Sequence, residues 1–348
     1  MAIKLKWGVL GAGGIAFRRT IPEGIVPAKN AELSGVYDVV KVVADQVGRQ
    51  FGAPVYADEK ALLAADLDVV YIATPAAAHY RQALAALRAG KHVLIEKPMA
   101  LTLDECRKIL AQAKKSGRKV GVDFMMRFHA HHREIKKIVE SGRLGKPVMA
   151  RAQLSCWYPP IKGAWRQIPK LGGGGSFMDM GCHCIDILEF VLGSKVKEVS
   201  CVTGSLVQKY AVEDTAVLTA RFANGAIGIV DACFSIPDNS SKNILEVYGS
   251  RGSILCRGTI GQAPGGEATS YLERAIKGYD ARQARSESAE LVLKVKPSNL
   301  YRAQVEFFSD AVLKGGEVPV SGDDGLWNQK IMLAAYESAK KGKSVLVR

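Results

Sequence analysis

Three ionisable side chains in the segment GGGGSFMDMGCHCID, residues 172–186, have a spacing that suits acid–base chemistry. Asp179, His183 and Asp186 are separated by four and then by three residues, which places them on one face if the segment is helical. The surrounding apolar residues also repeat at helical intervals, so we expect a helix from about residue 176 to residue 192. An imidazole that is oriented by a carboxylate one turn away can take a proton from an alcohol near neutral pH.

Two other interpretations of this segment stay open. His183 could form a metal site with a flanking cysteine or with Asp179, although residues two apart on a helix diverge and no second ligand cluster has suitable spacing. Alternatively, Ser176 could cap the helix, with Asp179 at the third position imitating a capping box. The preceding glycines, Gly172 to Gly175, allow unusual backbone angles and the close approach of a ligand.

A second group of histidines follows at His129, His131 and His132. Their proximity suggests a metal site as one interpretation. The HAHH sequence comes just after an expected strand end, and we favour a solvated helix start or the wall of a binding cleft. We expect no bound metal in this chain.

A glycine-rich turn near residue 11 indicates dinucleotide binding. It follows the strand-like run IKLKWGVL and has the pattern GxGxxA. The turn consists of Gly11, Ala12, Gly13, Gly14, Ile15 and Ala16. Its glycines permit a tight turn and let a pyrophosphate approach the backbone, and the small last residue lets the next helix pack closely. The N-terminus of that helix supplies N–H groups to the phosphates.

The second expected strand ends at Asp38. A carboxylate at this place can accept both hydroxyls of the adenosine ribose and repels a 2′-phosphate. No arginine follows, and the nearest cation is Lys41, so we expect NAD rather than NADP as the cofactor. The alternative is that Asp38 only caps the next helix.

Two further strand ends carry polar or constrained residues. One strand closes with Ala73, Thr74 and Pro75, and the next closes with Glu96, Lys97 and Pro98. The carboxyl end of a buried strand faces the nicotinamide end of a dinucleotide site, where an ammonium without a function is unusual. A role in catalysis is therefore one interpretation of Lys97, and an ion pair with Glu96 or contact with solvent is the other.

Strands and helices alternate through the first third of the chain, which predicts a parallel sheet covered on both faces. The expected strands are residues 3–10, 31–38, 68–74, 92–98 and 118–124, and the expected helices are residues 14–24, 39–52, 79–90 and 101–117. Ligands bind at the carboxyl ends of the strands in such a sheet. The fold class is therefore α/β, with an N-terminal doubly wound parallel sheet of the Rossmann type.

After residue 128 the pattern changes to long β-favouring segments, at residues 146–158, 195–205, 213–223, 225–235, 242–257 and 289–295. Asn224 and Gly225 separate two of them and predict a hairpin, so the second sheet should be antiparallel or mixed. We expect helices at 300–314 and 323–341, and a surface excursion at 258–288, where periodicity is weak.

The size and composition fit a globular protein of two domains. The chain has 348 residues, of which 48% are hydrophobic, and no window approaches the roughly 18 unbroken apolar residues of a membrane span. The N-terminus lacks the features of a secretory signal, and the seven cysteines form no CxxC pair, so we expect a cytoplasmic protein with reduced thiols.

The formal net charge is +14, from 48 basic and 34 acidic residues. The basic residues are scattered in short groups in or just after helix-like stretches, which argues against nucleic-acid binding. A solvated basic surface is the simpler interpretation, and the steering of an anionic cofactor or substrate is the alternative. We expect neither a nucleic-acid nor a membrane partner.

Taken together, several segments resemble the Gfo/Idh/MocA oxidoreductases, the family of glucose-fructose oxidoreductase and inositol dehydrogenase. The resemblance covers essentially the whole chain and rests on GVLGAGGIA, YIATPAAAH, HVLIEKPMALT, the MRF at 126–128 and GGGGSFMDMGCHCID. It implies an NAD(P)-binding Rossmann domain, here residues 1–122, and a substrate-binding and oligomerisation domain, residues 123–348. The second domain should have a large, mainly antiparallel open sheet that covers the nicotinamide, in a homodimer or homotetramer.

The resemblance also implies the site residues. It assigns cofactor contacts to Gly11, Ala12, Gly13, Gly14, Ile15, Asp38, Ala73, Thr74, Pro75, His79, Glu96 and Lys97. It places Asp179 and His183 on the family's Asp-x-x-x-His positions, and with Lys97 they form the implied catalytic group. One departure is Ala76, where the family often has an asparagine beside the nicotinamide ribose.

The expected reaction moves a hydride between a secondary alcohol of a sugar or cyclitol and the nicotinamide. His183 would act as the base, Asp179 would orient it, and Lys97 would stabilise charge on the alcohol oxygen. The candidate substrate-binding residues are Arg127, Trp157, Tyr158, Trp165, Arg166, Asp179 and His183. For Trp157 and Trp165, ordinary packing is the alternative. Two rival functions are glycoside cleavage through transient oxidation by a tightly bound NAD and non-catalytic NAD binding.

Overall fold

The computed structural model describes residues 3–273, 281 and 289–348, which form two compact units. The first comprises Met1–Phe128, Ala164–Gly173 and Asn299–Lys330, and the second comprises His129–Gly163, Gly174–Ser298 and Ile331–Arg348. Residues beyond 122, where a single boundary was expected, thus contribute to the first unit. No helix within the described ranges has the length and apolar character needed to cross a membrane.

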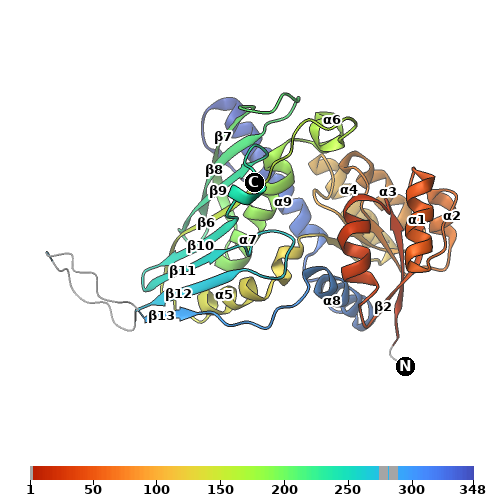
Figure 1. Cartoon of the computed structure of the whole chain (residues 1–348), viewed down its shortest axis with the longest axis horizontal. Coiled ribbons are helices and arrows are strands. Elements are labelled where there is room, and N and C mark those ends of the chain that lie inside the picture. The colour runs from red at the N-terminus through yellow and green to blue at the C-terminus, as the bar shows by residue number, and fades with distance from the viewer. Residues whose placement is uncertain (1–2, 274–280, 282–288) are drawn as a thin grey trace. The chain divides into compact units, whose positions relative to one another are not determined.

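A parallel five-stranded sheet forms the centre of the first unit and confirms the α/β expectation (Figure 1). Its order is β2-β1-β3-β4-β5, where β1 is Leu5–Leu10, β2 Ala31–Tyr37, β3 Val69–Ile72, β4 His92–Ile95 and β5 Val120–Val122. Every residue of β3 is buried, as an inner strand of a doubly covered sheet requires.

The helices of the first unit follow its strands. They are the π-type helix η1 (Ala16–Ile25), α1 (Lys41–Phe51), α2 (Glu59–Ala64), α3 (Ala76–Arg88), α4 (Leu103–Ser116) and the short η2 (Met125–Phe128). The sequence predicted each of the longer ones to within a few residues. It did not predict α2, which is too short to show a clear apolar period.

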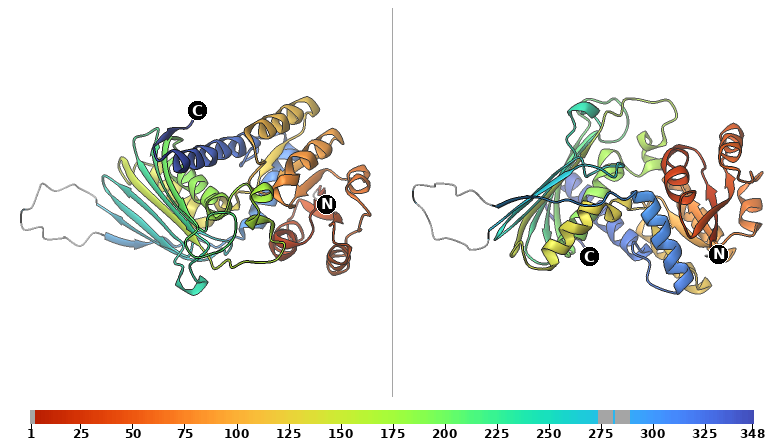
Figure 2. Two further views of the ribbon diagram at one scale, coloured as in Figure 1. Left: turned by 90° about the horizontal axis from the view of Figure 1, so that it is seen from above. Right: turned by 60° about the horizontal axis from the view of Figure 1, so that its bottom comes forward.

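A helix from the C-terminal part of the chain completes this unit. Helix α8 (Leu300–Lys314), blue in Figure 2, packs against η1 and η2. The Trp7 indole of β1 donates a hydrogen bond to Ser309 Oγ at 3.2 Å and meets the Phe308 ring edge to face, with the ring centroids 5.7 Å apart. Helix α9 (Gly322–Lys341) then begins in the first unit and ends in the second.

A nine-stranded sheet dominates the second unit, in the order β13-β12-β11-β10-β6-β9-β8-β7-β14. Its strands are β6 (Pro147–Ser155), β7 (Val196–Gly204), β8 (Thr215–Phe222), β9 (Ile227–Cys233), β10 (Ile244–Gly249), β11 (Gly252–Arg257), β12 (Glu267–Leu272), β13 (Ala289–Val292) and β14 (Val345–Leu346). The β6–β9 pair is parallel and the other pairs are antiparallel, which confirms the mainly antiparallel sheet.

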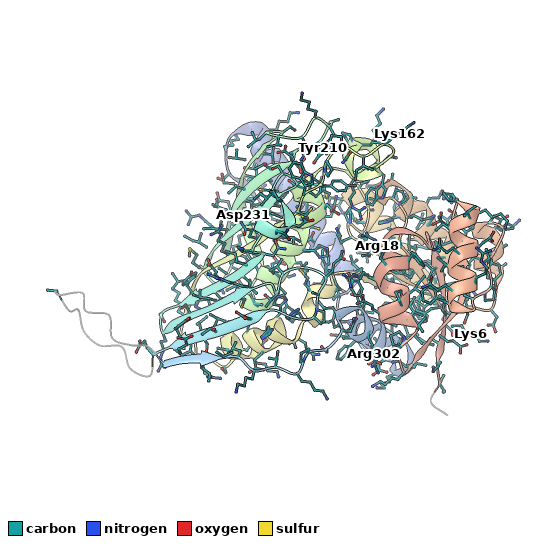
Figure 3. All side chains as sticks on the ribbon, viewed as in Figure 1. Lys6, Arg18, Lys162, Tyr210, Asp231 and Arg302 are labelled. Carbon is teal, nitrogen blue, oxygen red and sulfur yellow. The ribbon has the colours of Figure 1, made fainter. Side chains whose placement is uncertain are left out.

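Helices cover one face of this sheet. Helix α7 (Cys182–Leu192) packs on β6 and β9, and α5 (Ala130–Glu140) packs on α7 (Figure 1). Side chains on the opposite face alternate with the buried ones and are polar or exposed, as in β8. There Asp231, labelled in Figure 3, accepts hydrogen bonds from Arg151 at 3.0 Å and from Gln153 at 2.5 Å.

Two expectations for this sheet were wrong. Residues 242–257 form a hairpin of β10 and β11 rather than one strand, because the chain reverses at Ser250 and Arg251, between the paired residues Gly249 and Gly252. The φ of Gly252, +147°, favours glycine at the start of the second strand. Strand β12 also lies inside the expected surface excursion, where it pairs with β11 and β13. The rest of that excursion at 274–280 and 282–288 lies outside the described residues.

The hairpin expected at Asn224 and Gly225 is confirmed. It joins β8 to β9, and Gly225 has a φ of +91°. The Gly225 N–H donates to Phe222 O at 3.0 Å and closes the turn. The helices expected at 300–314 and 323–341 are also present as α8 and α9.

Candidate active site

Four neighbouring strands of the parallel sheet end at the same level. Tyr37, Leu10 and Ile72 are paired across β2, β1 and β3, and Ile72 is paired with Ile95 of β4. The residues that follow each strand therefore share one edge of the sheet, as the sequence predicted for ligand contacts. These residues begin the glycine-rich turn, the loop at Asp38, the Ala73–Pro75 loop and the Glu96–Pro98 loop.

The glycine-rich turn has the backbone geometry that the GxGxxA pattern requires. The N–H groups of Gly11 and Ala12 both donate to Tyr37 O, at 2.9 and 3.2 Å. Gly11 has a φ of +82°, and a Cβ there would lie 2.9 Å from the carbonyl carbon and oxygen of Ala73. A Cβ at Gly14 would meet no atom within 4 Å, so the space over this part of the turn is open.

The open turn fits a dinucleotide phosphate. Helix η1 begins at Ala16, the last residue of the glycine-rich turn, and the first turn of this helix carries no acidic residue that would compete with an anion. The N–H groups near the start of this helix and the small side chain at Ala16 are the features that a pyrophosphate needs. When bound, the nicotinamide cofactor would supply the hydride acceptor or donor.

Asp38 links the second strand to the glycine-rich turn. Its Oδ2 accepts from Gly13 N at 3.0 Å, and its Oδ1 accepts from Val40 N at 2.9 Å. Helix α1 begins after Val40 without a side-chain cap, so Asp38 holds the loop before the helix and is not its N-cap. The nearest cation expected from the sequence, Lys41, pairs with Asp45 at 2.6 Å on the surface.

His79 joins the loops that follow β3 and β4. Its imidazole is fully buried, with Nδ1 2.8 Å from Pro98 O and Nε2 2.8 Å from Thr74 O. Burial lowers the pKa of His79, while the hydrogen bonds to the Pro98 and Thr74 carbonyls act in the opposite direction. Ala76, where the sequence departs from the family pattern, is buried at the start of α3, the helix that also carries His79.

Glu96 is connected to a polar network inside the first unit. Its Oε1 accepts from the Tyr71 hydroxyl at 2.6 Å, and that hydroxyl lies 3.0 Å from Thr20 Oγ1 and 3.3 Å from Asp123 Oδ2. Burial and the neighbouring Glu96 carboxylate, which hydrogen bonds to Asp123, raise the pKa of Asp123 well above its usual range. Lys97, the residue after Glu96, is 9% exposed.

Asp179 and His183 lie at the start of the main helix of the second unit. The helix expected at 176–192 is present as a π-type turn, η4 (Phe177–Gly181), followed by α7. His183 and Asp186 are buried, and Asp179 is half-buried. Ser176 has helical backbone angles and makes no capping hydrogen bond, so the capping interpretation was wrong.

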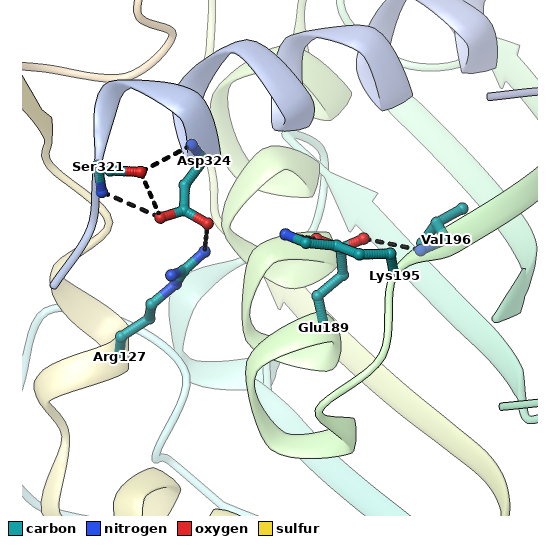
Figure 4. Close-up of polar contacts among 6 residues, drawn as sticks. All are labelled: Arg127, Glu189, Lys195, Val196, Ser321 and Asp324. Atoms are coloured by element: carbon teal, nitrogen blue, oxygen red, sulfur yellow. Dashed lines mark hydrogen bonds and ion pairs between the residues drawn. The ribbon is translucent and has the colours of Figure 1, made fainter. Parts of the chain in front are cut away.

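The candidate substrate residues divide between the two units. In the first, the Arg127 guanidinium donates to Asp324 Oδ1 at 3.3 Å, and Ser321 holds the same carboxylate (Figure 4). Also in the first unit, the Arg166 guanidinium carbon lies 4.2 Å from the centre of the Trp165 ring.

The remaining candidates, Trp157 and Tyr158, belong to the second unit. Trp157 is 45% exposed, and its backbone N–H donates to Asp238 Oδ1 at 3.0 Å. The Tyr158 ring packs against Phe234, with the ring centroids 4.9 Å apart, and its carbonyl accepts from the Tyr210 hydroxyl (labelled in Figure 3) at 3.2 Å.

The HAHH segment is buried, so the expectation of a solvated helix start was wrong in this respect. His129, His131 and His132 are at most 7% exposed, and the His129 ring stacks on His131 and meets His132 at a tilt, with the ring centroids 5.5 and 4.7 Å apart. The His129 Nδ1 accepts from His131 N at 3.2 Å and its Nε2 donates to Gly265 O at 2.9 Å, which fixes one neutral tautomer. Among the described residues, no cluster of three or more His, Cys, Asp or Glu could hold a metal ion.

Comparison with known proteins gives matches over both units. A family described as oxidoreductases with an NAD-binding Rossmann fold matches residues 5–124, and the GFO/IDH/MocA C-terminal domain matches residues 132–255. The 1,5-anhydro-D-fructose reductase of Ensifer adhaerens is 31% identical over 342 residues, or 97% of each chain. The myo-inositol 2-dehydrogenase of Thermotoga maritima is 26% identical over 353 residues, or 98% of each chain.

A solved structure also matches nearly the whole chain. The aldose-aldose oxidoreductase of Caulobacter crescentus, crystallised in complex with glycerol, is 26% identical and superposes with a TM-score of 0.88. The match covers 99% of both chains.

The Tyr71 network generates a prediction about stability. Tyr71→Phe removes the donor to the half-buried Glu96 carboxylate and should lower the free energy of unfolding by about 1–3 kcal/mol. Urea unfolding at neutral pH measures this change. Tyr80→Phe, on a half-buried tyrosine of the same unit, is the control and should change it by less than about 0.5 kcal/mol. Equal values for the two variants would contradict the network.

The buried His129 predicts a loss of stability in acid. Burial lowers the pKa of His129 to about 4 in the folded protein, against about 6.5 in the unfolded chain. Between these values the unfolded state binds a proton that the folded state refuses, so stability falls with falling pH by up to about 1.4 kcal/mol per unit.

The variant His129→Asn tests this prediction, because it keeps a side-chain acceptor for the His131 N–H and cannot titrate. Its free energy of unfolding, from urea titrations, should fall less than that of the wild type between pH 6.5 and pH 4. Parallel pH dependences for the two proteins would show that His129 is not the titrating group.

Proposed function

The chain belongs to the Gfo/Idh/MocA oxidoreductases, and from this premise we propose that it moves a hydride between nicotinamide and a secondary alcohol of a sugar, cyclitol or sugar derivative. The observation that carries the proposal is the position of Lys97. This nearly buried ammonium follows β4 at the same sheet edge as the open glycine-rich turn. The sugar and cyclitol enzymes among the relatives, which align over almost their whole length, support the substrate class.

The proposed mechanism gives each catalytic side chain one task. Lys97 stabilises the negative charge that develops on the alcohol oxygen as the hydride leaves its carbon. His183 accepts the hydroxyl proton, and Asp179, at the preceding helical turn, orients the imidazole. The reverse reaction uses the same groups, with protonated His183 as the acid.

We propose NAD as the preferred cofactor. The Asp38 carboxylate lies beside the glycine-rich turn, and the exposed residues that follow it, Val39, Val40 and Val42, are apolar. A 2′-phosphate would meet a negative charge here, and Lys41 is already paired with Asp45. The ribose hydroxyls of NAD can instead donate to the carboxylate.

We further propose that the protein works in the cytoplasm as a homodimer or homotetramer. Apolar side chains stand out from the uncovered face of the large sheet, among them Val202 at 73% exposure and Val217 and Ile227 at 45%. Such a face favours association with a second copy. All seven cysteines lie in the described part of the chain and none is in a disulfide, which suits a reducing compartment.

The catalytic assignment predicts a loss of turnover without a loss of cofactor binding. Lys97→Ala and His183→Ala should each lower kcat by about 100- to 10,000-fold. The measurement is NADH formation with NAD⁺ across a panel of aldoses, inositols, sugar acids and anhydrosugars, with the Kd for NAD⁺ measured in parallel.

Lys91→Ala is the matched control, because this lysine precedes β4, at the strand end opposite to Lys97, and donates to the carbonyls of Ala65 and Leu67. Its kcat should stay within about threefold of the wild type. Wild-type turnover in both Lys97→Ala and His183→Ala would refute the assignment. Failure of the wild type to release NADH with any substrate would favour a tightly bound cofactor or a non-catalytic protein.

The cofactor assignment predicts a shift in preference. Asp38→Asn keeps an acceptor for the Gly13 N–H but removes the charge that repels a 2′-phosphate. The ratio of kcat/KM for NAD⁺ over NADP⁺ should fall at least about tenfold, since a hydrogen bond to a charged group contributes about 1.5–3 kcal/mol. Asp45→Asn, at an exposed carboxylate of the following helix, should leave the ratio unchanged. A wild type that prefers NADP⁺ would reject the assignment.

A further inference from the structure

The first N–H groups of a helix have no partner within the helix and must find one elsewhere. At the start of the helix that carries Asp179 and His183, one distant carboxylate accepts from two of these N–H groups. Gly175 N donates to both Oε1 and Oε2 of Glu213 at 3.0 Å, and Phe177 N donates to Oε1 at 3.0 Å. Glu213 lies in the loop between β7 and β8, so this cap comes from another element of the second unit.

A tyrosine from α9 completes the contact. The Tyr336 hydroxyl donates to Glu213 Oε1 at 2.7 Å and accepts from Met178 N at 3.1 Å. Burial and the adjacent Glu213 raise the pKa of Tyr336 well above its usual range, so the hydroxyl stays a neutral donor. The Tyr336 ring also meets the Phe177 ring nearly at right angles, with the centroids 5.9 Å apart.

The glycines before the helix make room for this arrangement. A Cβ at Gly174 would lie 2.0 Å from the Tyr336 hydroxyl oxygen, and a Cβ at Gly175 would lie 2.0 Å from Glu213 O. That Glu213 carbonyl accepts from Ser176 N at 3.0 Å. At Gly174 and Gly175, the expected close approach is therefore made by the protein itself and not by a ligand.

One residue, Gly175, links this cap to the helix that carries the candidate catalytic residues. The Gly175 N–H is held by Glu213, and the Gly175 carbonyl accepts the first helical hydrogen bond from Asp179 N at 3.0 Å. His183 follows one turn later in the same helix. We propose that Glu213 and Tyr336 are positioning residues, which hold the start of this helix so that Asp179 and His183 take their working orientation. The inference rests on the proposed function of these two residues.

Two substitutions test the proposal with small changes in shape. Glu213→Gln keeps one acceptor oxygen and removes the charge, and Tyr336→Phe removes a single oxygen. Either should lower kcat at least about tenfold, because a misplacement of about 1 Å in a catalytic group can cost about 100-fold. The KM for NAD⁺ should stay within about twofold, since the glycine-rich turn belongs to the other unit.

Glu189→Gln is the matched control. Glu189 is a buried carboxylate at the opposite end of the same helix, where it accepts from Lys195 Nζ at 3.0 Å and from Val196 N at 2.7 Å (Figure 4). The variant Glu189→Gln loses the same charge as Glu213→Gln and should also lower the melting temperature. Its kcat should remain within about threefold of the wild type, which separates positioning from general stability.

A spectroscopic measurement tests the positioning without any substrate. The chain has six histidines, so ring ¹³C–¹H signals from ¹³C-histidine-labelled protein can be assigned, that of His183 by its loss in His183→Asn. The His183 signal should shift or broaden in Glu213→Gln and Tyr336→Phe and stay unchanged in Glu189→Gln. An unchanged His183 signal in both cap variants would overturn the proposal.

The two proposals fail in different ways. If the His183 signal responds as expected but the wild type turns over no sugar or cyclitol, the cap positions this helix and the proposed function is wrong. If the wild type is active and both cap variants keep its kcat, the function stands and the positioning role is wrong. If Glu213→Gln does not fold, Tyr336→Phe alone decides, because it leaves the carboxylate in place.

Discussion

Backbone pairing in the parallel sheet is the constraint on which the nucleotide half of the protein depends. Because Tyr37, Leu10, Ile72 and Ile95 are in register, the four loops that follow them start at one edge. Short contacts then join these loops: Gly13 to Asp38, Ala73 to the glycine turn, and Thr74 to Pro98 through the His79 ring. Residues that follow four separate strands are thus held together by hydrogen bonds that are mostly to the backbone.

In each unit, a tyrosine hydroxyl donates to a glutamate that lies close to candidate catalytic residues in the sequence or in the fold. In the first, the Tyr71 hydroxyl donates to Glu96, the residue before Lys97, and also lies 3.3 Å from Asp123 Oδ2. In the second, the Tyr336 hydroxyl holds Glu213, which holds the start of the helix with Asp179 and His183. Buried polar groups are stable only when their hydrogen bonds are complete, so such networks fix one orientation of the backbone beside them.

The sequence predicts local features of this protein well and distant contacts poorly. The strands of the first unit, the hairpin at Asn224 and the helix at 300–314 all follow from periodicity and turn chemistry, which act over a few residues. The cap at Gly175 does not, because Glu213 lies 38 residues away and a carboxylate before a strand carries no signal of its partner. Tyr71 is similar: it belongs to an apolar strand, and only the fold shows that its hydroxyl contacts Glu96 and Asp123. The roles of Lys97, Asp179 and His183 remain predictions from residue type, spacing and family.

The contribution of α8 to the first unit has a consequence for protein synthesis. When residue 128 leaves the ribosome, the sheet is complete but Trp7 still lacks Phe308 and Ser309, with which it packs in the finished protein. At the usual speed of translation, about 5–20 residues per second, this apolar surface waits roughly 10 to 40 seconds for its cover. A nascent chain in that interval has the exposed hydrophobic surface that chaperones bind, so the nucleotide-binding half matures only after most of the second half has been made.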